Sequence, residues 1–108
     1  MSINAVLVYC TVPDINTGKS IAAELVERKY AACVNILPSI LSVYRWQDKI
    51  EEAQECLLLI KTIQTCYPKL EASLLALHPY DTPEVIAVPI TTGAPDYLAW
   101  ITKSTLGA

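Results

Sequence analysis

Glycine is scarce in this chain of 108 residues, and the three that occur are Gly18, Gly93 and Gly107. Glycines this far apart cannot build a glycine-rich loop around a phosphate group. The sequence therefore excludes the common nucleotide-binding motifs that depend on such a loop.

The four cysteines include no Cys-x-x-Cys pair, so the zinc-ribbon and thioredoxin patterns are absent. We expect free thiols in a reducing cytosol. Cys33 and Cys56 lie in apolar stretches and are expected in the core. Cys66 stands near the start of an expected helix, where the helix dipole could lower its pKa, but packing is the favoured role.

Basic residues are few and scattered. The chain has eight Lys and Arg against eleven Asp and Glu, and only Arg28 and Lys29 are adjacent. It therefore lacks the basic stripe that nucleic acid or an anionic membrane requires. No apolar run is long enough to span a bilayer, and the N-terminal residues lack the basic start of a signal peptide. We expect a cytoplasmic protein that binds neither nucleic acid nor membrane.

Charged residues make up only 18% of the chain, whereas apolar residues make up 53%. A domain this small has much surface and little interior, so this apolar content exceeds what one small core needs. Burial of part of the surface in an oligomer explains the excess. A well-filled core with many alanines and leucines is the alternative.

Hydrophobic periodicity predicts four strands and three helices. The strands are expected at residues 5–11, 33–46, 50–62 and 84–90, the first of them buried on both faces. One helix follows Gly18 and ends near Tyr30, and two more are expected at residues 65–77 and 96–102. Pro38 indicates a sheet edge or a bulge, and Asp48 is expected at positive φ in the turn between the long strands.

This order, β-α-β-β-α-β with a terminal helix, is the α+β ferredoxin-like pattern in a single domain over residues 1–108. It implies an antiparallel sheet with two helices on one face and a long central hairpin. Strands usually have five or six residues, so the outer half of this hairpin must project into solvent or pack on another subunit. A closed ring, most simply a homotrimer, would cover the second face of the sheet.

The segment His-Pro-Tyr-Asp-Thr-Pro-Glu at residues 78–84 holds the only histidine. Its two prolines restrict the backbone, so the loop is expected to be stiff. Histidine titrates near neutral pH and is the commonest metal ligand, which makes this loop the first candidate for a site. The acidic residues Glu51, Glu52 and Glu55 are interpreted as a solvated face, with a weak cation site as the alternative.

Together these segments closely resemble the CutA divalent-cation-tolerance proteins over nearly the full length of the chain. The matching motifs include Cys-Thr-Val-Pro-Asp, Ser-Val-Tyr-Arg-Trp and the His-Pro-Tyr loop, and they lie at residues 10–14, 31–35, 42–46, 49–51, 55, 57–62, 78–84 and 97–100. The resemblance implies a trimer of ferredoxin-like subunits, similar in architecture to the PII signal-transduction proteins. It also implies a link to copper and other divalent cations.

The metal positions proposed for that family correspond to Cys10 and His78 in this sequence. A soft thiolate and an imidazole suit copper or zinc better than magnesium or calcium. Glu84, Asp81 or a residue of a neighbouring subunit would complete the site. Some family members have a second histidine where this chain has Leu77, so weak copper binding is expected.

The turn before the lysine departs from the family in a second way, because Asp48 replaces the common glycine. This change is expected to affect local turn geometry only.

A PII-like small-molecule sensor is the alternative function, with ligand clefts between subunits. Four aromatic residues could line such clefts, namely Tyr44, Trp46, Tyr80 and Trp100. The same residues are also typical of subunit interfaces. A Cys–His nucleophile would be the enzyme interpretation. No motif of thiol catalysis is present, so a non-enzymatic protein is predicted.

Overall fold

The computed structural model describes residues 4–105, and Gly107 and both ends of the predicted 1–108 domain lie outside this range. The element order is β1 (Ala5–Val12), α1 (Ile15–Glu27), β2 (Cys33–Trp46), β3 (Lys49–Ile63), the short 3₁₀-helix η1 (Gln64–Cys66), α2 (Tyr67–Leu77), β4 (Val85–Pro89) and α3 (Pro95–Lys103). This order confirms the predicted ferredoxin-like pattern with a terminal helix. No helix in residues 4–105 combines the length and apolar character needed to cross a membrane.

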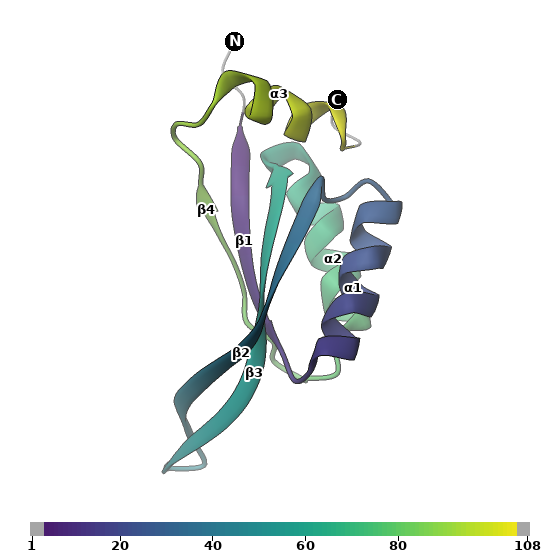
Figure 1. The fold of residues 1–108 in the computed structure, drawn as a ribbon. Coiled ribbons are helices and arrows are strands. Elements are labelled where there is room, and N and C mark those ends of the chain that lie inside the picture. Colours follow the sequence, from purple (N-terminus) through teal and green to yellow (C-terminus); the bar gives the residue numbers. More distant parts are fainter. Residues whose placement is uncertain (1–3, 106–108) are drawn as a thin grey trace.

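The four strands form one antiparallel sheet in the order β2-β3-β1-β4. Helices α1 and α2 lie side by side on one face, and α3 lies at the end of the sheet that is farthest from the hairpin tip (Figure 1). The opposite face has no helix over it in the described part of the chain. Pro89 ends the edge strand β4, as its missing N–H requires.

Central strand β1 corrects one prediction, because it is not fully buried on both faces. Val8, Cys10 and Val12 are wholly buried toward the helices, whereas Leu7 and Tyr9, which point the other way, are only partly buried. Alternating strand residues point to opposite faces, and only one face carries helices. The continuous apolar run thus reflects a second apolar face, which residues 4–105 leave without a covering helix.

The main core lies between the sheet and the two helices. Five wholly buried side chains fill it: Leu25 of α1, Leu58 and Ile60 of β3, and Leu70 and Leu74 of α2. Burial of one such side chain stabilises the fold by about 1.5–3 kcal/mol.

Gly18 lets α1 approach the sheet closely. A Cβ atom at this position would lie 3.3 Å from both Leu58 and Val12 side chains.

Helix α1 begins earlier than predicted, at Ile15, because the Asp14 side chain accepts a hydrogen bond of 2.8 Å from the Thr17 N–H. It also ends earlier, where Lys29 adopts a φ of 62°. The Tyr30 N–H then bonds back to the Leu25 carbonyl, and the Lys29 N–H to that of Val26. These two bonds form a Schellman motif, so the helix stops before Tyr30.

The hairpin of β2 and β3 is long and contains the expected irregularity at Pro38, where the pairing shifts between Leu37 and Ile40. The Cys56 thiol donates a hydrogen bond of 3.2 Å to the Pro38 carbonyl, so this carbonyl at the bulge has a partner. Figure 1 shows the outer half of the hairpin projecting from the body of the molecule. Trp46 and Ile50 there are 61% and 69% exposed.

The remaining differences lie at element ends. Thr65, the predicted start of the second helix, belongs to η1, and Pro68 stands in the first turn of α2 as expected. Cys56 and Cys66 are buried as predicted, but Cys33 is only half-buried because β2 is an edge strand.

Candidate functional site

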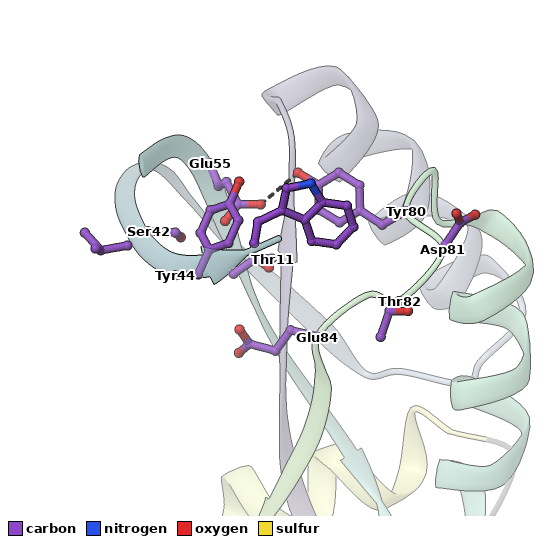
Figure 2. A pocket seen from close by; sticks show the side chains of 10 residues that line it. Thr11, Ser42, Tyr44, Glu55, Tyr80, Asp81, Thr82 and Glu84 are labelled. Carbon is purple, nitrogen blue, oxygen red and sulfur yellow. Dashed lines mark hydrogen bonds between the residues drawn. The ribbon is translucent and has the colours of Figure 1, made fainter. Parts of the chain in front are cut away.

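A pocket of about 720 Å³ lies where the hairpin meets the loop after α2. Three segments supply its lining: β1, the outer part of the hairpin, and the loop that contains Tyr80. Figure 2 shows the side chains that line it, which are Thr11, Ser42, Val43, Tyr44, Trp46, Glu55, Tyr80, Asp81, Thr82 and Glu84. Three of the four predicted cleft aromatics, Tyr44, Trp46 and Tyr80, are therefore in one place within a single chain.

Glu55 and Tyr80 join the hairpin to the loop. The Tyr80 hydroxyl donates a hydrogen bond of 2.8 Å to Glu55 Oε2, drawn as a dashed line in Figure 2. Glu55 is only 9% exposed, so it does not belong to a solvated acidic face as predicted, although Glu51 and Glu52 are exposed. Burial, together with the bond to Glu55, raises the pKa of Tyr80 to about 12.

His78 is the first residue of this loop, directly after α2, and its side chain is only 8% exposed. Its Nδ1 accepts a hydrogen bond of 3.1 Å from the Tyr80 N–H, so Nε2 carries the proton and donates to the Thr11 carbonyl at 2.8 Å. The ring also packs against that of Tyr80, with centroids 4.8 Å apart. Both nitrogens are thus engaged, and in this arrangement His78 holds the loop on β1 and has no free lone pair for a metal.

Cys10 is wholly buried on the helix side of β1. Burial, reinforced by the negative charges of Glu84 and Glu55, raises the pKa of its thiol to about 12. At neutral pH the sulfur is therefore a neutral thiol, whereas metal binding and nucleophilic attack both require the thiolate.

The predicted trio of Cys10, His78 and Glu84 is not assembled as a metal centre within the subunit. Among residues 4–105, no three His, Cys, Asp or Glu side chains lie close enough together to hold an ion. Glu84 lines the pocket with its carboxylate directed toward the hairpin side, whereas Asp81 points away from it in Figure 2.

Trp100 does not line this pocket. It lies on α3, where its ring is 5.6 Å from that of Tyr97 and 44% exposed. Glu55 is the site residue that sequence reasoning misassigned. Its position next to Cys56, opposite the irregularity that Pro38 predicts, is the signal that could have indicated its burial.

Comparison with known proteins places these features in a family context. The sequence profile described as "CutA1 divalent ion tolerance protein" matches residues 6–104. The divalent-cation tolerance protein CutA of Thermus thermophilus is 48% identical over 99 residues, which are 92% of this chain and 96% of that protein. The chloroplastic protein CutA of Arabidopsis thaliana is 47% identical over 96% of this chain, which spans 57% of that longer protein.

Solved structures agree with the sequence comparison. The CutA1 structure from Oryza sativa superposes with a TM-score of 0.95 at 43% identity, covering 99% of this chain and 98% of the other. The Cut A1 structure from Thermus thermophilus has a TM-score of 0.91 at 46% identity, covering 94% and 98% respectively.

Proposed function

The chain belongs to the CutA1 divalent ion tolerance protein family, and from this premise we propose that it is a non-enzymatic homotrimer that takes part in the response to divalent cations and binds copper weakly. Several relatives, among them that of Thermus thermophilus, carry divalent-cation tolerance in their names, which supports the cation role. The protonated Cys10 thiol supports a non-enzymatic role, because it is a poor nucleophile.

The placement of the Glu55 and Glu84 carboxylates in one pocket, next to Thr11, is the observation that carries the cation proposal. Both carboxylates lie near enough to disfavour the Cys10 thiolate. A bound divalent cation reverses this preference, because its positive charge stabilises the carboxylates and promotes loss of the thiol proton. Since His78 must first break its bond from the Tyr80 N–H to ligate through Nδ1, binding is expected to be weak.

Copper titration tests this proposal. Calorimetry with Cu²⁺ should show weaker binding, by about tenfold or more, in Glu84→Gln and in Cys10→Ser, because each change removes a proposed ligand. Even the loss of a group that only supports a ligand costs about 10–100-fold in metal affinity. His78→Ala should have a smaller effect, since the imidazole is already engaged. Glu71→Gln on α2 is the control for loss of one carboxylate outside the pocket. Copper binding that is equally strong in Glu84→Gln and Cys10→Ser would discard the site.

Two uncovered apolar surfaces support the trimer. The open face of the sheet exposes Ile86 and Val88 by 54% and 41%, and the projecting hairpin exposes Leu41 and Ile50 by 61% and 69%. Patches of this kind on a small protein are typical of association surfaces. In a closed ring, each subunit offers both surfaces to its neighbours.

A small-molecule sensor is the second candidate function, and the open aromatic pocket favours it. Its volume lies within the range of ligand sites, which is roughly 300–1,000 Å³. A metabolite that binds only the native state raises the melting temperature, so a thermal-shift screen tests this function. A screen without a stabilising compound counts against it.

We also propose a cytosolic location, which the four free thiols of the described residues support. Cell fractionation, followed by detection with an antibody raised against this protein, tests the location, and recovery in an exported fraction would contradict it.

A further inference from the structure

The pocket between the hairpin and the 78–84 loop is lined by side chains of one charge sign only. Glu55 and Glu84 contribute carboxylates, and no lysine, arginine or histidine is among the described residues that line it. A phosphate or carboxylate ligand would meet repulsion without a compensating donor of positive charge. The lining therefore selects against anions, including nucleotides.

Aromatic rings form the other part of the lining. Tyr44 and Trp46 come from the hairpin, and Tyr80 comes from the loop. The hydroxyl of Tyr80 is bonded to Glu55, and its ring packs on the ring of His78, so it is held in place before any ligand arrives. Aromatic faces attract cations, and the attraction grows when the site is shielded from water.

We propose that this pocket binds a small organic cation, whose ammonium group lies against the aromatic rings beside Glu55 and Glu84. The inference rests on the second candidate function, small-molecule sensing, and adds the chemical class of the ligand. A metal ion fits the pocket less well as sole occupant, because no three ligating side chains converge in the described residues. A volume of about 720 Å³ also leaves room for an alkyl chain beyond the ammonium group.

The raised pKa values of two neighbouring groups, Cys10 and Tyr80, are consistent with a negative field that no positive charge compensates. Burial is the largest cause of the raised pKa of Cys10, and Glu84 and Glu55 raise it further. For Tyr80, the Glu55 carboxylate adds to the effect of burial. A ligand cation would supply the positive charge that the lining lacks.

Tetramethylammonium and its neutral analogue tert-butanol form the test pair, because they have similar size and differ in charge. Saturation-transfer NMR on the full chain should show saturable binding of tetramethylammonium and at least tenfold weaker binding of tert-butanol. Trp46→Leu should weaken tetramethylammonium binding by about three- to thirtyfold, which is the range of cation–π energies. Glu84→Gln, on the exposed side of the pocket, should also weaken it.

Trp100→Leu is the matched control, because it removes an exposed indole that is not part of the pocket. It should bind tetramethylammonium like the wild type, and circular dichroism should show that every variant is folded. Equal binding of tert-butanol, no saturable tetramethylammonium signal, or binding unchanged in both pocket variants would overturn the inference. Stabilisation by an uncharged or anionic metabolite in the thermal-shift screen would then keep the sensor function while removing the cation class.

Discussion

At the scale of single residues, the bond between Tyr80 and Glu55 joins two segments that lie far apart in the sequence. The Tyr80 hydroxyl supplies a donor to a carboxylate that is largely withdrawn from water. Loss of a partner leaves such a group unsatisfied, which costs more than the bond itself contributes. This contact therefore positions the loop and also limits where the acid can lie.

Tyr80→Phe should lower the free energy of unfolding by about 1–3 kcal/mol, because it leaves the buried Glu55 carboxylate without its hydrogen-bond donor. Tyr67→Phe is a matched control, since the Tyr67 hydroxyl donates to Glu71 at 2.9 Å along one turn of α2. That local helix contact should cost about 0.5 kcal/mol or less. Denaturant unfolding measures both variants, and equal losses would show that the Glu55 contact has no special weight.

Cys10 gives a residue-scale prediction for alkaline pH. Its pKa is raised from 9.0 to about 12 by burial and by Glu84 and Glu55. The folded state therefore keeps the thiol proton that the unfolded chain loses. The stabilisation is complete below pH 9, the ordinary value, and is lost as the pH rises toward 12.

Unfolding measured at pH 7 and at pH 10 should show this loss as about 1–2 kcal/mol in the wild type from this one group. Cys10→Ala removes the titrating thiol, so its stability should fall less over the same interval, whatever its stability at pH 7. Parallel pH profiles for the two proteins would contradict the assignment.

Residue contacts between distant segments are also where sequence reasoning reached its limit. The spacing of Glu51, Glu52 and Glu55 in the sequence predicts one solvated face. The structure separates Glu55 from the other two because it lies beside the Pro38 irregularity and meets Tyr80 across 25 positions. The irregularity at Pro38 could indicate that Glu55 is buried, but no local pattern predicts its contact with Tyr80.

At the scale of elements, the hydrophobic periodicities were sufficient to predict the four strands and three α-helices in order, but not the short η1. The boundaries were less predictable because caps and turns depend on single side chains and backbone angles. Asp14 starts α1 ahead of its apolar stripe, and Lys29 ends it early by adopting a positive φ. In the hairpin turn, Asp48 was expected at positive φ, and Gln47 shares that conformation.

Asp48→Gly is the element-scale prediction. Asp48 has a φ of 65°, a region that costs an L-residue roughly 1–2 kcal/mol. Glycine removes this strain but increases the entropy of the unfolded chain, so a net gain of about 0.5–1 kcal/mol is expected. Lys49→Gly, at the adjacent strand position, should instead lose about 0.5–1 kcal/mol. Denaturant unfolding that shows a loss for Asp48→Gly would contradict this account of the turn.

At the scale of the whole molecule, the two sides of the sheet differ in what covers them. One side packs against α1 and α2, and the other presents partly exposed apolar residues that no described element covers (Figure 1). The projecting hairpin adds a second apolar surface. The apolar excess in the composition is therefore found on these surfaces as well as in the core.

The last prediction is that three chains associate through these two surfaces. Sedimentation equilibrium at micromolar concentration should give the mass of three chains for the wild type. Ile50→Lys and Ile86→Lys place a charge on the hairpin and on the open sheet face, where the side chains are 69% and 54% exposed. Both should shift the mass toward the monomer without unfolding the subunit, because a buried unpaired charge opposes association and an exposed one does not oppose folding.

Leu75→Lys is the control for this experiment, since Leu75 is 48% exposed on helix α2, away from both surfaces. It should leave the trimer mass unchanged. The melting temperature of the wild type should also rise with protein concentration, whereas that of the dissociated variants should not, because only association stabilises by mass action. A wild-type protein that sediments as a monomer would remove the ring and require another partner for the open face of the sheet.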